Sequence, residues 1–380
     1  MERRRGAHRA RWLGSVDESY ALMEQCIDAA RLSVRLETYI LRETGPGAKL
    51  HAALLRACGR GVAVSLLVDA FGSEDLREGF LDSLRKAGAQ VSRFNPHRWL
   101  RRSLRNHRKL LACDGTQAII GGFNIGPEYA GDGVRVGWCD TGVWIAGPVV
   151  HDLERSFDQM FSLAPFTPSL LRRFRRAHRG VSSKARSREV CLLTGGPALS
   201  GRGLRGVLQH DLASAQQIRI ASGYFLPSRR IRRQLYLAVR RAGMVQILLT
   251  GRSDVPMARL AVQAMYDQLL RRGLQIHEYG PQMLHAKLVI MDDLVHVGSC
   301  NLDQRSLYIN YELQLRFDWP ELAEDARAWF NQAMVHAAQV DAGSWKKGRS
   351  WWRRLSSWLA WLLLARIDPL IARRAFRGLS

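Results

Sequence analysis

The sequence is poor in acidic residues and has no cysteine pairs with a recognisable spacing. Its 380 residues contain 57 Lys and Arg against 34 Asp and Glu, which gives a formal net charge of +23. This excess predicts an anionic partner, either nucleic acid or an anionic membrane surface, and charge alone does not choose between them. The cysteines are expected to be buried thiols in a reducing compartment. They are Cys26, Cys58, Cys113, Cys139, Cys191 and Cys300.

Long apolar runs are also scarce. Residues 1–5 are basic, but no apolar stretch of signal-peptide length follows them, so the sequence indicates no secretion. No apolar run reaches the length of a membrane span. We therefore expect neither a signal peptide nor a membrane-spanning helix.

A motif that occurs twice dominates what the sequence does contain. The copies read NHRKLLACDGTQAIIGGFNIG from residue 106 and LHAKLVIMDDLVHVGSCNLD from residue 284. Each has a His, a Lys two residues later, an Asp five residues after the Lys, a Gly-Gly or Gly-Ser pair and an Asn. The first set is His107, Lys109, Asp114, Gly121, Gly122 and Asn124, and the second is His285, Lys287, Asp292, Gly298, Ser299 and Asn301.

The residue types in this motif suit chemistry at phosphorus. The residues after each Lys are apolar and end at an Asp turn, which predicts a buried strand and a hairpin. Because residues i and i+2 of a strand share a face, each His and Lys project toward one pocket. A Lys ammonium binds phosphate oxygens, and an imidazole can attack phosphorus or transfer a proton. Two such sets facing each other would supply a nucleophile, a general acid and hydrogen-bond donors.

These repeats are similar to the paired His-x-Lys-x4-Asp signatures of the phospholipase D superfamily, and their flanks resemble its bacterial cardiolipin synthase branch (B-type). The flanks are residues 36–40 (LETYI), 67–73 (LVDAFGS), 140–143 (DTGV) and 298–307 (GSCNLDQRSL). The resemblance covers roughly residues 12–340. It departs at Cys300 and Gln304, and the second copy has one residue fewer after Asp292, which changes the turn type.

The resemblance implies a phosphatidyltransferase that transfers a phosphatidyl group from phosphatidylglycerol or another phospholipid to an alcohol, such as the headgroup of a second phosphatidylglycerol. His107 would form a phosphatidyl-histidine intermediate, and His285 would act as general acid and base. Ser299 would help to bind the phosphate or to orient a histidine, and four side chains would hold the non-bridging phosphate oxygens. The four are Lys109, Lys287, Asn124 and Asn301.

The family also has an acidic residue that fixes the second ring nitrogen of each His, as in a catalytic triad. The candidates are Asp140 and Glu312, and we expect each to lie behind the His of the opposite half. Asp114 and Asp292 are counted with the catalytic motif, although as turn residues they are better suited to fixing the hairpin. No metal or cofactor is expected, because Lys and imidazole would stabilise the charge.

Strands alternate with helices in both halves, which predicts an α/β fold of two tandem phospholipase D-like α/β/α domains related by internal duplication. The expected bounds are 12–165 and 189–342, with a helix at 321–340 closing the second domain. A basic N-terminal arm at 1–11 is expected to be mobile, and a basic linker joins the domains at 166–188.

The first half is longer than the second near the motif. Tyr224 follows Tyr39 by 185 positions, whereas His285 follows His107 by 178, so the first half has seven extra residues, at 97–103. His97 lies within this insertion, beside the predicted active-site loop.

The last segment, 343–380, differs from the rest in composition. It interleaves Trp and Leu with Lys and Arg, which predicts an amphipathic helix lying on anionic lipid with its rings at headgroup depth. The alternative is a helix that packs its Leu and Trp face on the catalytic body. The Trp residues are Trp345, Trp351, Trp352, Trp358 and Trp361.

Three other functions stay open. A nuclease of the same superfamily explains the charge and both motifs equally well, but it has no use for the Trp-rich tail. A phospholipase D hydrolase, with water as acceptor, shares the motifs. A catalytically inactive lipid-binding scaffold is disfavoured by the intact His and Lys of both copies. The sequence therefore predicts a peripheral enzyme of the bacterial cell membrane, with phosphatidylglycerol and an alcohol as substrates and no nucleic-acid partner.

Overall fold

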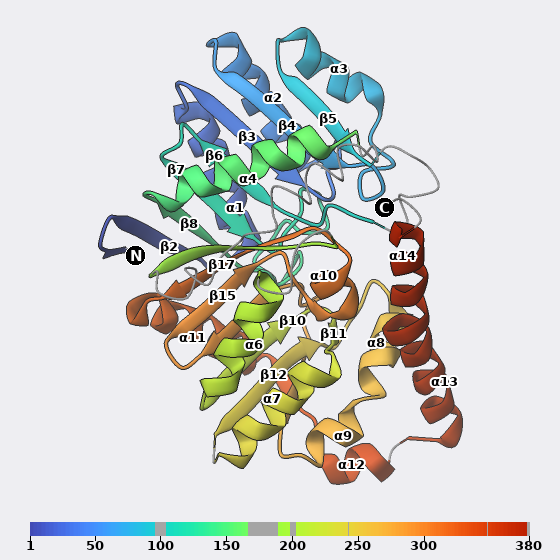
Figure 1. Cartoon of the computed structure of the whole chain (residues 1–380). Coiled ribbons are helices and arrows are strands. Elements are labelled where there is room, and N and C mark those ends of the chain that lie inside the picture. The colour runs from blue at the N-terminus through green and yellow to red at the C-terminus, as the bar shows by residue number, and fades with distance from the viewer. Residues whose placement is uncertain (96–103, 166–188, 198–202, 242, 348, 378–380) are drawn as a thin grey trace.

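Two mixed β-sheets of eight strands each form the frame of the molecule (Figure 1). The computed structural model describes the whole chain except residues 96–103, 166–188, 198–202, 242, 348 and 378–380. The predicted linker at 166–188 and the insertion at 97–103, with His97, therefore lie outside the described residues.

The described residues of the first half form one sheet and four helices. Its strands are β1 (Glu2–Arg5), β2 (His8–Leu13), β3 (Ser33–Thr38), β4 (Ala63–Asp69), β5 (Gln90–Phe94), β6 (Leu110–Cys113), β7 (Gln117–Gly121) and β8 (Gly142–Ala146). Its helices are α1 (Val16–Ala29), α2 (Pro46–Gly59), α3 (Glu78–Lys86) and α4 (Val149–Leu163). The strand order is β1-β2-β8-β7-β6-β3-β4-β5, and β3, β4 and β5 run parallel.

The second half repeats this arrangement. Its sheet strands are β9 (Val190–Gly195), β10 (Gln217–Ser222), β12 (Met244–Thr250), β13 (Gln275–Tyr279), β14 (Lys287–Met291), β15 (Leu294–Gly298), β17 (Glu312–Asp318) and β18 (Ala337–Gln339). Short strands β11 (Phe225–Leu226) and β16 (Leu302–Asp303) pair separately. The helices are α6 (Leu204–Ser214), α7 (Arg229–Arg240), α8 (Pro256–Gln263), α9 (Tyr266–Leu270), α10 (Gln304–Tyr308) and α11 (Pro320–Val335).

The order of the second sheet, β18-β13-β12-β10-β14-β15-β17-β9, shows the duplication directly. Read from β9 to β13, it matches the first sheet from β2 to β5 strand for strand, with the same parallel and antiparallel pairs. The predicted α/β class and internal duplication are therefore confirmed. The motif strands β6 and β14 occupy equivalent positions inside the two sheets.

The two halves share one apolar core. On β6, Leu111 and Cys113 contact the cluster formed with α1 and α2, whereas Leu110 and Ala112 point the other way. This alternation is the period-2 pattern of a strand buried on both faces. The cluster that contains Leu110 also contains Leu288 of β14, so apolar side chains of both halves pack together.

The N-terminal segment is an ordered part of the first sheet, so the prediction of a mobile arm is wrong. Residues 2–13 form the β1–β2 hairpin, and β2 pairs antiparallel with β8 in the first sheet. Ala10 and Trp12 are buried in the core and alternate with Arg9 and Arg11, which is the period-2 pattern of a half-buried strand. Arg3 also forms a bidentate ion pair with Asp325 of α11, at 2.7 and 2.9 Å. The first sheet therefore begins before residue 12.

The helix predicted at 321–340 is shorter than expected. It starts with Pro320 in its first turn and ends at Val335. The chain then turns, and β18 pairs antiparallel with β13, so residues 337–339 form an edge strand instead of a helix.

The C-terminal tail is helical and contacts the second half (Figure 1). It consists of α12 (Ala342–Lys347), α13 (Trp351–Leu362), the π-helical turn η2 (Leu363–Ile367) and α14 (Asp368–Arg377). The stretch Trp351–Ala372 is 22 residues long, and by length and composition it could cross a membrane. This corrects the expectation that no such segment exists; a few charged residues divide the apolar run in the sequence.

Candidate active site

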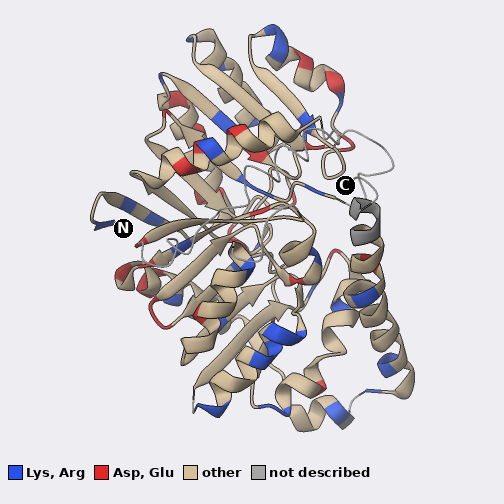
Figure 2. Cartoon of the chain, in the orientation of Figure 1, with Lys and Arg blue, Asp and Glu red and all other residues tan. Residues whose placement is uncertain are grey.

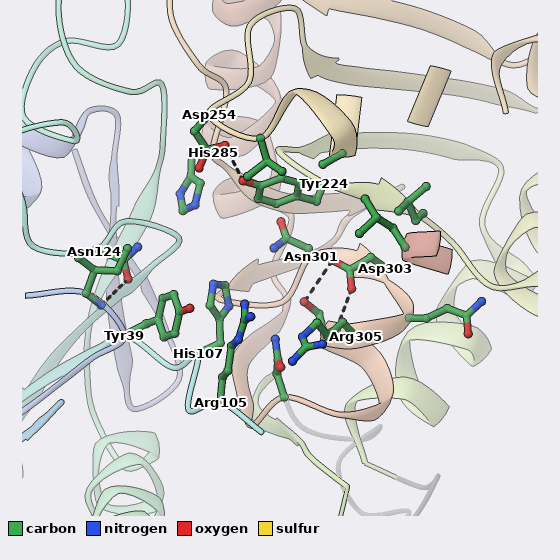
Figure 3. A pocket seen from close by; sticks show the side chains of 18 of the residues that line it. Tyr39, Arg105, His107, Asn124, Tyr224, Asp254, His285, Asn301, Asp303 and Arg305 are labelled. Carbon is green, nitrogen blue, oxygen red and sulfur yellow. Dashed lines mark hydrogen bonds between the residues drawn. The ribbon is translucent and has the colours of Figure 1, made fainter. Parts of the chain in front are cut away.

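A cavity of about 360 Å³ opens between the two halves, and both motif histidines line it (Figure 3). Figure 3 shows the His107 and His285 rings pointing into this cavity from opposite walls. Asn124 and Asn301 line it as well. The structure thus brings the two motif copies, 178 residues apart, to one site.

Main-chain bonds between the halves hold each His at the start of its strand. The His107 N–H donates to the Tyr311 carbonyl at 2.9 Å, and the His285 N–H donates to the Cys139 carbonyl at 2.8 Å. Each acceptor directly precedes an acidic residue of the opposite half, Glu312 or Asp140. The backbone therefore sets the distance between each imidazole and its carboxylate.

Both carboxylates lie behind the histidines as expected. His107 Nδ1 is 3.1 Å from Glu312 Oε2 and 3.1 Å from the Ser299 carbonyl oxygen. His285 Nδ1 is 2.7 Å from Asp140 Oδ2. These contacts confirm the expected positions, whereas the chemical roles stay predictions. An acceptor on Nδ1 leaves Nε2 as the nitrogen that reacts.

The two motif lysines are buried beside the histidines. Lys109 Nζ donates to the His107 carbonyl at 2.7 Å and lies over the Tyr39 ring. Lys287 Nζ lies within 2.9 Å of both ring nitrogens of His285. Burial lowers the pKa of Lys287 to about 8, and burial together with the nearby Lys287 charge lowers the pKa of Lys109. A bound anion would relieve this repulsion and favour both charged forms.

The histidine and glutamate pKa values move in opposite directions for the same reason, which is burial. Burial and the adjacent Lys287 lower the pKa of His285 to about 3, and the pKa of His107 is also well below its usual value. Burial raises the pKa of Glu312 to about 8. Each shift favours the neutral form in a site that water barely reaches.

Of the two roles expected for Ser299, binding phosphate or orienting a histidine, its contacts fit the second. Its hydroxyl donates to Glu312 and accepts the Leu313 N–H, while its carbonyl faces His107. In the first half Gly122 takes this place, where an added Cβ would come within 2.5 Å of Asp140 Oδ1. The Gly-Gly and Gly-Ser pairs therefore accommodate the carboxylates behind the histidines.

Asp114 and Asp292 lie outside the cavity, which corrects their inclusion among the catalytic residues. Asp114 accepts the backbone N–H groups of residues 31–33, at 2.8 to 2.9 Å. Asp292 accepts those of Gln216 and Gln217. Both have positive φ values, 57° and 50°, in the hairpin turn at the far end of the motif strand. A short carboxylate tolerates this conformation and satisfies the turn, so their role is structural.

The two asparagines differ in their contacts. The Asn124 side chain donates to the Tyr129 hydroxyl at 2.7 Å and accepts the Ile40 N–H at 3.2 Å. Asn301 Oδ1 is buried and has no hydrogen-bond partner among the described residues. Asn301 Oδ1 can therefore accept a hydrogen bond from a substrate hydroxyl, whereas both amide atoms of Asn124 already have partners.

Several residues that line the cavity were not predicted from the sequence, because the repeated motif does not assign them a chemical role. The Tyr39 ring lies 5.0 Å from His107, and the Tyr129 and Trp138 rings lie 5.3 and 5.2 Å from His285. The repeat of Tyr39 as Tyr224 was the available signal. Arg105, Arg305, Asp254 and two tail residues, Leu364 and Asp368, also line the cavity.

Equivalent hydrogen bonds hold the two segments that carry the motif histidines, and the sequence alone did not predict these bonds. Asp69 accepts the Asn106 N–H at 2.7 Å, and Thr250, in the equivalent strand, accepts the Leu284 N–H at 3.2 Å. Within the described part of the chain, no group of three or more His, Cys, Asp or Glu could hold a metal ion.

Comparison with known proteins agrees with this geometry. The family model for the "Cardiolipin synthase, PLD-like domain" matches residues 23–161 and again residues 208–334. The chain belongs to this family. Each match contains one His-x-Lys motif and the strands around it, so family membership confirms the resemblance and the duplicated fold.

Relatives within the cardiolipin synthase family cover most of the chain. The cardiolipin synthase of Geobacillus sp. (strain WCH70) is 32% identical over 346 residues, which cover 88% of this chain and 68% of the relative. Cardiolipin synthase B of Salmonella typhi is 31% identical over 364 residues, which cover 93% of this chain and 87% of the relative.

A solved structure shows that the same fold occurs in a more distant protein. Phosphatidylserine synthase of Haemophilus influenzae Rd KW20 superposes with a TM-score of 0.71 at 15% identity, covering 96% of this chain and 95% of that one.

Proposed function

We propose that this protein is a phosphatidyltransferase that forms cardiolipin through a phosphatidyl-histidine intermediate. The crossed pairing of each cavity histidine with a carboxylate of the opposite half carries this proposal. It places two oriented imidazoles on opposite walls of one cavity (Figure 3), as a nucleophile and an acid that act on the same phosphorus require.

In the first step, His107 Nε2 forms a bond to the phosphorus of a phospholipid, and the bond from phosphorus to the headgroup alcohol breaks. His285 gives its proton to the departing oxygen. A low pKa makes the His285 imidazolium a strong acid, and the bound phosphodiester anion favours its charged form. Lys109, Lys287 and Asn301 stabilise the charge on the non-bridging oxygens.

In the second step, the hydroxyl of an acceptor alcohol loses its proton to His285 and attacks the phosphorus. The bond between phosphorus and His107 breaks, which frees the imidazole for the next cycle. Donor and acceptor are both phosphatidylglycerol, so the products are cardiolipin and glycerol. The names of the relatives support this choice.

The tail supports a peripheral position on an anionic membrane. On α13, Ser357 and Ala360 are buried toward the body, where α13 packs against α8. Trp345, Trp361 and Leu364 pack against the core of the second half, so the alternative of packing on the body holds for them. Most of the other large apolar residues of the tail are exposed. They are Trp351, Trp352, Leu355, Trp358, Leu359, Leu363, Ile367, Leu370 and Ile371.

Basic side chains accompany this apolar face. Figure 2 shows Lys and Arg along the tail, on α7 and on the N-terminal hairpin. Each Lys or Arg near an anionic surface adds roughly 1 kcal/mol of attraction, and Trp rings lie well at headgroup depth. The outward Trp rings beside these basic residues thus support phospholipid as the anionic partner.

The test is incubation of the purified protein with labelled phosphatidylglycerol in mixed micelles, without added metal, followed by chromatography. We expect cardiolipin and glycerol. Phosphatidic acid as the sole product would identify a hydrolase instead, and cleavage of nucleic acid without lipid turnover would identify a nuclease. His107→Ala should abolish turnover. His210→Ala, at an exposed histidine on α6, is the control and should leave turnover intact.

A further inference from the structure

Arg305 lines the active-site cavity and is held there by the tail. Its Nη1 donates to both carboxylate oxygens of Asp368, at 2.7 and 2.8 Å, across 63 residues of sequence. The side chain of Arg305 is 16% exposed and that of Asp368 is 39% exposed. Asp368 and Leu364 are cavity-lining residues themselves, so the tail reaches the cavity at this ion pair.

We propose that Arg305 binds the phosphodiester of the second phospholipid, the acceptor, and that Asp368 occupies this position until the lipid displaces it. This inference rests on the proposed function. A carboxylate and a phosphodiester both offer two oxygens to a guanidinium, and Arg suits such paired recognition better than Lys. The Asp368 side chain therefore marks where an anionic oxygen pair fits.

The chemistry of cardiolipin formation requires a second anion site. Donor and acceptor each carry one phosphodiester. The donor phosphorus must lie between the two histidines, with its oxygens near the motif lysines, so the acceptor phosphate needs a separate cation. Two of the described residues that line the cavity are arginines, Arg105 and Arg305.

Of these two arginines, Arg305 is the one already paired with an anion. Arg105 instead lies over the Phe71 ring, with 4.4 Å between its guanidinium carbon and the ring centroid. Figure 3 shows both guanidinium groups on the wall that carries His107 and Asn301. Arg305 is thus inside the reaction space and already in the geometry of anion recognition.

Arg305 breaks the symmetry of the duplication, because the equivalent position of the first half has a different residue. It lies four residues after Asn301, and the residue four after Asn124 is Glu128. Glu128 lies 3.9 Å from Arg42 and does not line the cavity. The parts that act on phosphorus therefore occur twice, whereas the first half has no arginine at the position equivalent to Arg305. A reaction whose two lipid substrates play different roles needs such a difference between the walls.

The position of Asp368 connects this site to the lipid surface. The outward apolar residues Leu363, Ile367 and Leu370 flank it in the tail. A lipid that arrives at this face meets the Arg305–Asp368 pair at the edge of the cavity, and its phosphate competes with the carboxylate for the same guanidinium.

The ratio in which the enzyme forms two competing products tests this inference. Vesicles of labelled phosphatidylglycerol with ethanol in the water offer one donor and two acceptors, and only the lipid acceptor carries a phosphate. We expect Arg305→Gln to lower the ratio of cardiolipin to phosphatidylethanol by roughly 10- to 100-fold, the scale of a lost charged hydrogen bond. Arg305→Lys should lower it less. Asp368→Asn should raise it several-fold, because the competing carboxylate is gone.

The control is Arg327→Gln, which removes an ion pair with Asp293 that lies outside the cavity, and its ratio should match that of the unmodified protein. Equal loss of both products in folded Arg305→Gln, or an unchanged or lower ratio in Asp368→Asn, would overturn the inference. If the unmodified protein forms neither product, the proposed function itself fails, which is a separate outcome.

Discussion

At the scale of single residues, the site depends on carboxylates supplied across the duplication. Asp140 belongs to the first half and contacts Nδ1 of His285, whereas Glu312 belongs to the second half and contacts Nδ1 of His107. Neither half contains a complete histidine–carboxylate pair for its own motif. This crossing makes the two halves one catalytic unit.

Replacing either acidic side chain by its amide should impair chemistry more than folding. Asp140→Asn and Glu312→Gln leave the shape but present the wrong partner to Nδ1, so kcat should fall by about 10²- to 10⁴-fold. The matched control is Asp211→Asn. Its carboxylate makes a similar 2.8 Å contact to buried His296 outside the cavity, so it should lower Tm without a comparable loss of kcat. Equal losses of kcat in all three variants would contradict the orienting role.

A substrate with an acidic leaving group can distinguish the histidine that attacks from the histidine that donates the proton. With a phosphodiester of nitrophenol, His285→Ala should still release one equivalent of nitrophenol in a burst, because this oxygen needs no proton. The phosphorus should then stay on His107, as seen by mass spectrometry. His107→Ala should give no burst. The reverse pattern would exchange the two roles.

The lowered pKa of Lys287 predicts the alkaline limb of the pH profile. A Lys with a pKa of about 8 is charged below pH 8 and becomes neutral as the pH rises through 8. Because kcat/KM reports the free enzyme, it should fall above about pH 8 when measured with a soluble phosphodiester. In Lys287→Arg, the guanidinium stays charged, and the remaining activity should persist to higher pH. A flat profile up to about pH 10 would exclude Lys287 as an essential cation.

At the scale of elements, the tail combines two roles that the sequence suggested only in part. Trp361 and the small side chains of α13 pack on the second half, most of the other large apolar side chains face outward, and Asp368 reaches the cavity. Removing everything after residue 343 would therefore expose α8 and alter the site together. Point substitutions on the outward face separate membrane binding from these other effects.

Trp351→Glu combined with Trp358→Glu should weaken binding to phosphatidylglycerol vesicles and leave the fold intact. Both side chains are more than half exposed, so little packing is lost. The lost apolar burial and the added negative charges act in the same direction. Co-sedimentation at physiological salt gives the bound fraction, and far-UV circular dichroism checks the fold. Leu32→Glu, at a 71% exposed residue of the first half, is the control. Unchanged co-sedimentation of the double variant would remove the tail from membrane binding.

At the scale of the whole molecule, one shared core joins the halves. The cluster that contains Leu110 and Val143 of the first half also contains Leu288, Leu313 and Trp319 of the second. A domain interface made of buried apolar side chains couples the unfolding of both sides. The active site lies along this junction, so its geometry depends on the association of the two halves.

Unfolding should therefore be a single transition. Denaturation followed by tryptophan fluorescence and by far-UV circular dichroism should give coincident midpoints, because Trp residues lie in both halves. The residue Phe157 is buried in the shared cluster, and Phe157→Ala should lower this common midpoint by removing core packing, at a cost of about 3–5 kcal/mol. Two separate transitions would show that the halves unfold independently.

Local pattern was enough to predict much of this protein. Apolar strands after each Lys, the 178-residue repeat of His-x-Lys and the alternation of strands and helices predicted the duplicated α/β fold. The histidines and the crossing of Asp140 and Glu312 followed from the resemblance that this repeat revealed. These features are encoded in spacing and periodicity, which a sequence shows directly.

Tertiary structure decided the features that depend on distant partners. The sequence does not show that residues 8–13 complete a sheet, because the partner strand β8 lies over a hundred residues away. Nor does it show that the Ser299 hydroxyl contacts Glu312, or that Asp114 caps a backbone turn. The pairing of Arg305 with Asp368 has no local signal either, because the two residues meet only once the tail has packed on the body. Such contacts depend on where the folded chain brings separate segments together, and no periodicity in the sequence records that.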